Sequence, residues 1–394
     1  MDSFFRTHAF LVQHLNAPVR RDLMDEINWN HRLIGIKGTR GVGKTTFLLQ
    51  YAKEKFNPDD RSCLYINTNN FYVQEIGIRQ FAAEFYNQGG RVLLIDQVFK
   101  LPDWSRQLRD CYDRFPQLKI VFTGSSVMRL KEENPELYGI VHSYNLRGFS
   151  FREYLNLMTR NDFPSYSLSD IEKNHVEIAK EITSKVEPRK YFDHYLHHGF
   201  YPFFLEKRDF SENLLKTMNM MIEVDILLLK QIELKYLAKI KKLFYLLTCN
   251  GTSVPNVSKL AQTLNISRAT VMNYIKYLAE ARLVNIIYNV GEEFPKKPGR
   301  IQLHNPNLLY SFYPQNFDKH DVWDAFFCNT MWKDHQLSKD GSKNGAFIVD
   351  EKKRYKVVEH PSKLKNGVDV YFATYNCDVG SKNQIPLWLL GFLY

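Results

Sequence analysis

The eight residues GTRGVGKT, at positions 38–45, constrain the fold of this chain more than any other segment. They match the pattern G-x-x-x-x-G-K-[ST] at every fixed position. The glycines allow a tight curl that points backbone N–H groups at a phosphate, Lys44 adds a cation for the β and γ oxygens, and Thr45 offers a hydroxyl to Mg²⁺. The sequence therefore predicts a loop that binds ATP with Mg²⁺. The residues predicted to hold the nucleotide are Gly38, Arg40, Gly41, Val42, Gly43, Lys44, Thr45 and Thr46.

The segments around this loop have the expected pattern. Residues 32–37 (RLIGIK) predict a short buried strand and residues 45–56 predict a helix. A second buried strand is predicted at 92–96 (VLLID), after a Gly-Gly turn signal. Asp96, at its end, is predicted to bind nucleotide and orient the Mg²⁺ ligands. The alternative is an ordinary core strand that ends in a capping aspartate.

The residue after Asp96 is Gln97, and it bears on catalysis. Many ATPases of this kind place a glutamate there to activate the attacking water. An amide positions a water but cannot take its proton. We therefore expect ATP binding with weak or absent hydrolysis.

A third strand is predicted at 119–123 (KIVFT), followed by Gly124, Ser125 and Ser126. Strand ends beside a phosphate loop face the phosphates, so Ser125 is predicted to contact the nucleotide, with Thr123 and Ser126 as alternatives. The competing interpretation is that one of the serines only caps the next helix.

The chain is too long for one typical core, and its pattern changes along the sequence. We expect a P-loop nucleotide-binding domain at 1–148 and a helical lid at 149–230, which opens with the capping box Ser150 to Glu153. A winged helix-turn-helix is expected at 231–290, and a small α+β domain at 291–394. The predicted fold is thus α/β, with a RecA-like core and three appended parts.

The net charge of +10 is concentrated in residues 231–290, which hold 8 Lys and Arg against 2 Asp and Glu. This segment predicts an amphipathic helix at 237–247, a second helix, a tight turn, a third helix capped by Ser267, and a β-hairpin within 283–290. The polar face of the third helix predicts contacts to duplex DNA. The alternative is an internal docking module without DNA. The residues predicted to contact DNA are Arg268, Asn273 and Lys276.

The remaining composition predicts a cytoplasmic protein without a membrane partner. Five scattered cysteines without a C-x-x-C pair predict reduced thiols and no metal or disulfide framework. The first residues lack the pattern of a secretory signal, and the longest apolar run, 385–394, is too short to span a bilayer.

Several idiosyncratic motifs together resemble one group of proteins. These are bacterial ATP-binding proteins with an AAA-type P-loop domain, a winged helix and a C-terminal domain of unknown function, relatives of the archaeal ATPases of the STAND group. The motifs are GTRGVGKTT at 38–46, LLIDQVFKLPDWS at 93–105, FTGSS at 122–126, GFSFREYL at 148–155, LHNPNLLY at 303–310 and IPLWLLGFLY at 385–394.

The sequence also departs from that group. Asp-Glu is usual where this chain has Asp96 and Gln97, and an arginine pair is usual where it has Gly139 and Ile140. Arg147 is close enough in sequence to replace the pair, and the resemblance therefore implies that Gln97 and Arg147 occupy the catalytic positions. The strand ending at 66 typically leads to an aspartate, where residues 67–70 offer only amides and a hydroxyl.

The C-terminal domain of the group resembles a restriction-endonuclease-like core. Glu359, Lys363 and Asp324 are the remaining candidates for its metal site, and Ala346 stands where the central acid is expected. The resemblance thus implies an inactive nuclease domain.

Taken together, these features predict an ATP-binding switch whose nucleotide state controls the lid and the winged helix, with an unidentified protein partner. The alternatives are an active ATPase motor or DNA-processing enzyme, and a DNA-bound regulator in which nucleotide is structural.

Overall fold

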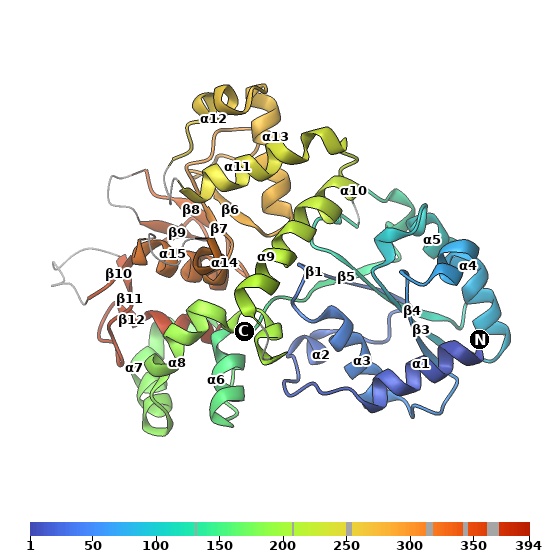
Figure 1. Ribbon diagram of the computed structural model, residues 1–394. Helices are drawn as coiled ribbons and strands as arrows, with labels where there is room; N and C mark the ends of the chain where they lie inside the picture. The colour runs from blue at the N-terminus through green and yellow to red at the C-terminus, as the bar shows by residue number, and fades with distance from the viewer. Residues whose placement is uncertain (131, 207–208, 250–253, 313–317, 342–345, 361–369) are drawn as a thin grey trace. The chain divides into compact units, whose positions relative to one another are not determined.

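The computed structural model describes residues 1–394 apart from 131, 207–208, 250–253, 313–317, 342–345 and 361–369 (Figure 1). The chain forms two compact units, Met1–Gly148 and Phe149–Tyr394. We call them unit 1 and unit 2.

Unit 1 contains a five-stranded sheet in which all neighbouring strands are parallel, in the order β2-β3-β4-β1-β5. Buried apolar runs form its central strands because helices cover both faces of a parallel sheet. The strands predicted at 32–37, 92–96 and 119–123 are confirmed as β1, β3 and β4. The strands are β1 Leu33–Gly38, β2 Cys63–Asn67, β3 Val92–Asp96, β4 Lys119–Ser125 and β5 His142–Asn145.

Helices lie on both faces of this sheet (Figure 1). Helix α3 follows the phosphate loop and packs on the central strands and on α1, whereas α4 and α5 pack together. The helices are α1 Asp2–Gln13, α2 Leu23–Glu26, α3 Lys44–Lys55, α4 Phe71–Asn87 and α5 Trp104–Arg114, with 3₁₀ turns at Val98–Lys100 and Pro135–Leu137. Because the strands are parallel, the carboxyl ends of β1, β2, β3 and β4 lie along one edge of the sheet.

Unit 2 begins with the helical segment, and the predicted capping box is confirmed. Ser150 accepts a hydrogen bond from the backbone of Glu153, whose carboxylate accepts one from the backbone of Ser150, each at 3.0 Å. Pro164 lies in the break after the first helix and Pro188 begins a later one. The helices are α6 Phe151–Thr159, α7 Leu168–Lys185, α8 Pro188–His194, α9 Phe210–Met220 and α10 Leu227–Leu229, with π-helical turns at Tyr195–Gly199 and Met221–Ile226 and 3₁₀ turns at Pro202–Glu206 and Leu234–Tyr236.

The basic segment folds into three helices and a two-stranded antiparallel ribbon. These are α11 Leu237–Cys249, α12 Val257–Leu264, α13 Arg268–Glu280, β6 Val284–Ile287 and β7 Arg300–Leu303. The Ser267 side chain caps α13, as predicted. The hairpin predicted within 283–290 is wrong in one respect, since only β6 lies there and its partner β7 begins at Arg300.

The last part of unit 2 is a second sheet with two helices. Its order is β12-β11-β10-β9-β8, antiparallel from β8 to β10 and parallel from β10 to β12. Strands β9 and β10 pair with each other on either side of a short turn at 350–352. The elements are α14 Pro306–Phe312, α15 Lys319–Met331, β8 Leu337–Lys339, β9 Phe347–Val349, β10 Lys353–Val358, β11 Val370–Thr374, β12 Gln384–Pro386 and a final 3₁₀ helix Leu387–Phe392.

The motif LHNPNLLY lies at the centre of unit 2 and joins its parts. Asn307 donates to the carbonyl oxygens of Tyr195 and Leu196 at 3.0 and 2.8 Å and accepts from the backbone of Phe200 at 3.0 Å. His304, which is buried, contacts Asn285 of the ribbon at 2.8 Å. The helical segment, the ribbon and the C-terminal part therefore share one polar core.

Candidate nucleotide site

The phosphate loop has the backbone that its glycines predict. Gly41 and Gly43 have positive φ angles of 81° and 90°, a region that favours glycine. A Cβ atom at Gly38 would lie 2.4 Å from the carbonyl oxygen of Leu146, so only glycine fits there. Gly43 is the N-cap of α3, and Val42 is fully buried beneath the loop. The first turn of α3 therefore directs its N–H groups toward the loop, as anion binding requires.

Lys44 lies over the loop itself. Its Nζ atom donates to the carbonyl oxygens of Gly38 and Thr39, each at 2.8 Å. The ammonium group is thus held inside the curve of the loop. These two carbonyl oxygens accept two of the three hydrogen bonds that an ammonium group can donate.

Thr45 and Asp96 lie together at the sheet edge. The Thr45 hydroxyl donates to Asp96 Oδ2 at 2.6 Å, and the Thr123 hydroxyl donates to Asp96 Oδ1. Asp96 is only 1% exposed. A hydroxyl and a carboxylate are hard oxygen ligands of the kind that Mg²⁺ takes beside phosphates. The residues present therefore fit a Mg²⁺-nucleotide.

Two residues from β2 also reach this carboxylate. Tyr65 donates from its hydroxyl to Asp96 Oδ2 at 3.1 Å, and Asn67 donates from its amide at 3.4 Å. Sequence reasoning noted the amides after 66 but missed Tyr65. The alternation of a strand could have found it, because residues 65 and 67 face the same side of β2.

Gln97 has a left-handed backbone, with φ at 60°. Its backbone N–H donates to the Thr123 hydroxyl at 2.9 Å, and its carbonyl oxygen accepts from the Thr68 hydroxyl at 2.8 Å. Its side-chain oxygen is buried and makes no hydrogen bond to the residues that the structure describes. The backbone of this position is thus fixed by neighbours on both sides, independently of the side chain.

The other predicted nucleotide residues lie around the loop. Ser125 is buried, pairs in register with Gly38, and accepts a hydrogen bond from Val127 N–H at 3.4 Å, a local turn contact. Arg40 is half-buried within the loop, and Thr46 is exposed in the first turn of α3. Ser125 therefore lies beside the phosphate loop, and its hydroxyl also accepts a hydrogen bond within the local turn.

Arg147 is half-buried just beyond β5. Its backbone is bonded by Arg21, a residue that the sequence analysis did not identify. Arg21 is 8% exposed and donates to the carbonyl oxygens of Arg147 and Gly148 at 2.9 and 3.1 Å. It also donates to the carbonyl oxygen of Val42 at 3.4 Å. Arg21 therefore ties the phosphate loop to the segment that carries Arg147.

The residues predicted to contact DNA lie in unit 2. Arg268 and Asn273 are exposed on α13, and Lys276 is half-buried. The Arg268 side chain contacts the Ser258 hydroxyl. The Lys276 ammonium lies 4.6 Å from the ring centre of Phe294, in the loop between β6 and β7.

The candidate nuclease residues do not form a metal site in the described ranges. Asp324 pairs with Arg300, and burial raises the pKa of this carboxyl although Arg300 acts in the opposite direction. Glu359 lies 3.8 Å from the ring nitrogen of His360 and Ala346 is buried, while Lys363 lies outside the described residues. Among described residues, no three His, Cys, Asp or Glu side chains gather as metal ligands. All five cysteines are free thiols.

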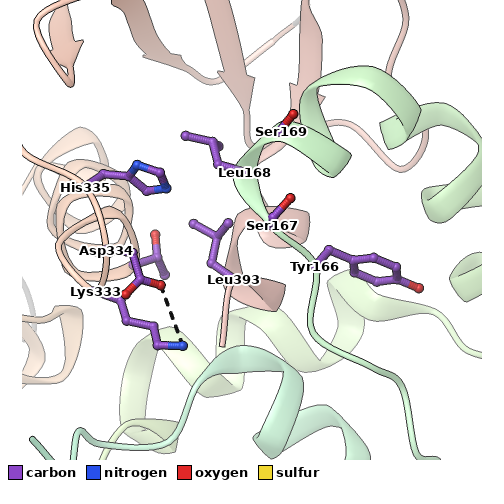
Figure 2. A pocket seen from close by; sticks show the side chains of 9 residues that line it. Tyr166, Ser167, Leu168, Ser169, Lys333, Asp334, His335 and Leu393 are labelled. Atoms are coloured by element: carbon purple, nitrogen blue, oxygen red, sulfur yellow. Dashed lines mark ion pairs between the residues drawn. The ribbon is translucent and has the colours of Figure 1, made fainter. Parts of the chain in front are cut away.

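A cavity of about 250 Å³ lies within unit 2, between the start of α7, the end of α15 and the C-terminal residues (Figure 2). Leu168 and Leu393 line it, and Lys333 pairs with Asp334 at 3.7 Å at one side. None of the predicted site residues lines this cavity. In the ranges that the structure describes, every helix is too short or too polar to cross a lipid bilayer.

Comparison with known families agrees with the geometry of unit 1. Residues 30–155 match the family model described as AAA domain. The chain carries an AAA-type domain. Residues 189–302 match a domain of unknown function, DUF8612, which includes α11 to α13 and nearly the whole ribbon.

Two curated relatives are uncharacterized proteins of Methanocaldococcus jannaschii. MJ1637 is 29% identical over 280 residues, which cover 67% of this chain and 58% of that protein. MJ1544 is 23% identical over 266 residues, which cover 64% and 56%. The chain thus matches little more than half the length of either relative.

Two solved structures are similar to parts of the chain. PCH-2 of C. elegans has a TM-score of 0.24 and 19% identity, covering 44% of this chain and 47% of that chain. The Aeropyrum pernix ORC1 protein in complex with DNA has a TM-score of 0.31 and 11% identity, covering 82% and 91%.

Proposed function

We propose that the chain is an ATP-binding switch that holds Mg²⁺-ATP in unit 1 and hydrolyses it slowly. The observation that carries this proposal is the bond of 2.6 Å between the Thr45 hydroxyl and Asp96 Oδ2. It joins Thr45, the last residue of the phosphate-loop pattern, to Asp96 at the end of β3. Strand β3 lies two places in the sheet from β1, the strand that leads into the loop. Two residues predicted separately from the sequence are thus in direct hydrogen-bond contact.

Binding relies on the backbone of the loop and on Lys44. The N–H groups at the start of α3 face the phosphates, and Lys44 exchanges its carbonyl partners for phosphate oxygens. The exchange keeps the ammonium group hydrogen-bonded in both states, so its cost is small. Arg40, Thr46 and Ser125 border the same loop and contact the nucleotide in this proposal.

Thr45 and Asp96 are the residues that would hold Mg²⁺. The ion, when bound, neutralises charge on the β- and γ-phosphates. Tyr65, Asn67 and Thr123 support the acid with neutral donors. The donors that contact the Asp96 carboxylate in these bonds are therefore all uncharged.

Slow hydrolysis follows from the residue beside the acid. Gln97 orients a water through its side-chain oxygen, which has no protein partner in the described residues, but it cannot remove a proton. Arg147, the proposed cation for the γ-phosphate, is held by its backbone through Arg21. The described residues of the proposed site therefore include groups that bind and orient a nucleotide, and the residue beside the acid offers no strong base.

The test is to measure ATP binding by calorimetry and single-turnover hydrolysis on the same sample of the full chain. Lys44→Ala is expected to abolish measurable binding, because it removes the mobile cation of the loop. Lys55→Ala, in the last turn of the same helix, is the matched control and is expected to bind like the wild type. Equal affinities for wild type and Lys44→Ala would refute the site, and rapid wild-type turnover would favour an active ATPase.

We further propose that α11 to α13 and the ribbon form a winged helix that contacts duplex DNA. The supporting observation is the contact between Lys276 and Phe294. It holds the loop between β6 and β7 against α13, and that loop carries the exposed residues Lys296 and Lys297. Basic side chains from the helix and from the loop therefore lie close together, as phosphate contacts on both sides of a groove require.

Charge reversal tests this surface. Arg268→Glu combined with Lys296→Glu and Lys297→Glu is expected to weaken retention of duplex DNA at least tenfold and to lower its salt dependence. Lys173→Glu combined with Lys180→Glu and Lys216→Glu, at exposed positions of α7 and α9, is the control with the same change in net charge. Unchanged DNA retention in the combined variant would instead favour a module that docks a protein partner.

A further inference from the structure

Tyr65 contacts the acid of the candidate site, although it belongs to no motif. It lies on β2, is 7% exposed, and donates to Asp96 Oδ2 at 3.1 Å. Thr45 donates to the same oxygen atom at 2.6 Å. The phenol and the phosphate-loop hydroxyl thus share one carboxylate oxygen.

The backbone of Tyr65 is held from the other side. Strand β2 is at the edge of the sheet, and its Tyr65 N–H donates to His8 Nδ1 of helix α1 at 3.0 Å. His8 is 1% exposed, and burial lowers the pKa of its imidazole, so Nδ1 stays an acceptor. Helix α1 therefore fixes the strand position from which the phenol reaches Asp96.

We propose that Tyr65 is a positioning residue that orients the Asp96 carboxylate toward nucleotide-bound Mg²⁺. This inference rests on the proposed function of unit 1. A carboxylate that is 1% exposed needs hydrogen-bond donors to satisfy its buried oxygens and to hold it in one orientation. The phenol supplies a rigid one, because its ring is packed in the sheet and cannot rotate away as a longer side chain could.

The position of the phenol supports this role, because its hydroxyl reaches Asp96 Oδ2 at 3.1 Å. The oxygen that Tyr65 contacts is also the oxygen that contacts Thr45, the other predicted Mg²⁺ residue. Loss of the phenol is therefore expected to affect the metal, whereas the loop N–H groups and Lys44 continue to bind phosphate.

The experiment measures the affinity of the full chain for ATP by calorimetry, once with excess Mg²⁺ and once with EDTA. Tyr65→Phe is expected to weaken Mg²⁺-ATP binding about tenfold, which corresponds to about 1.4 kcal/mol. Binding in EDTA is expected to stay within about twofold of the wild type. A tenfold loss is of the size expected for one hydrogen bond to a charged group.

Two further variants make the result specific. Tyr51→Phe removes the hydroxyl of another buried tyrosine of unit 1, which stacks on Trp29, and is expected to behave like the wild type in both conditions. In an Asp96→Asn background, Tyr65→Phe is expected to cause no further loss, because the phenol acts through Asp96.

Several results would overturn the inference. Equal weakening with Mg²⁺ and with EDTA would mean that Tyr65 only stabilises the fold. Unchanged Mg²⁺-ATP affinity, or a loss that adds fully to that of Asp96→Asn, would mean that the phenol does not act through the acid. If the wild type itself binds no ATP, the proposed function fails, which is a different outcome from a failure at Tyr65.

Discussion

Gln97→Glu is expected to raise single-turnover ATP hydrolysis about 100-fold with little change in ATP affinity. A positioned general base contributes about 10²- to 10⁴-fold. We expect the lower end because the resemblance described in the sequence analysis implies an arginine pair where this chain has Gly139 and Ile140. A 100-fold gain corresponds to about 2.7 kcal/mol of activation free energy.

The structure explains why the substitution should leave the site intact. The bonds that fix position 97 come from its backbone to Thr123 and Thr68, at 2.9 and 2.8 Å, and they do not involve the side chain. Glutamate has nearly the same shape as glutamine. Its buried carboxylate would lie next in sequence to Asp96, and both burial and the like charge raise the pKa of a carboxyl group. The variant's turnover should therefore rise as pH increases through that raised pKa, because the base must be deprotonated.

The assay is hydrolysis with protein in excess over ATP, measured at several pH values. Gln88→Glu, at the exposed C-cap of α4, is the matched control and should not differ from the wild type. Gln97→Glu with Ile140→Arg should be faster still if a cation is also missing. Rapid wild-type hydrolysis that Gln97→Glu fails to increase would show that another residue activates the water.

Two further predictions concern buried polar contacts. Arg21→Met should lower the free energy of unfolding of unit 1 by about 3 kcal/mol and weaken ATP binding, because it removes bonds to the carbonyl oxygens of Arg147 and Gly148. Urea unfolding measures the stability and calorimetry measures the ATP affinity, with Arg61→Met at an exposed ion pair as the control. Normal ATP affinity of Arg21→Met would contradict the link between Arg21 and the phosphate loop. Asn307→Ala should lower the free energy of unfolding of unit 2 by about 3 kcal/mol, because three backbone groups lose the side chain that they bond. The control is Asn219→Ala, at an exposed position of α9, and urea unfolding measures both variants. Equal stability of the two variants would contradict a shared polar core.

The sequence predicted the parts of the site that depend on local patterns. The phosphate loop follows from glycine spacing, β3 from a continuous apolar run, and the buried face of α13 from helical periodicity. Val271, Tyr274, Ile275 and Leu278 recur at helical spacing in the sequence, and all of them are buried. Such features depend on residues that are close together in the chain.

Contacts between distant segments were not predictable in the same way. Tyr65 lies 31 positions from Asp96, and Arg21 lies 126 positions from Arg147. Which strands become neighbours depends on the order of the whole sheet, and no local pattern specifies it. The ribbon shows the same limit, since alternation within 283–290 indicated a hairpin, whereas Tyr288 instead accepts a bond from the backbone of Lys339 at 2.7 Å.

The two amide residues near Asp96, Asn67 and Gln97, have a common electrostatic effect. Residues 67 and 97 are both amides, and the Asn67 amide donates to Asp96 at 3.4 Å. A second carboxylate at either position would repel the negative phosphates and compete with Asp96 for the same donors. Under the proposed function, amides at both positions avoid that repulsion, and neither of them can deprotonate water. Tight retention of ATP and slow turnover are therefore both expected from the same two residues, and this is the combination that a switch controlled by bound ATP requires.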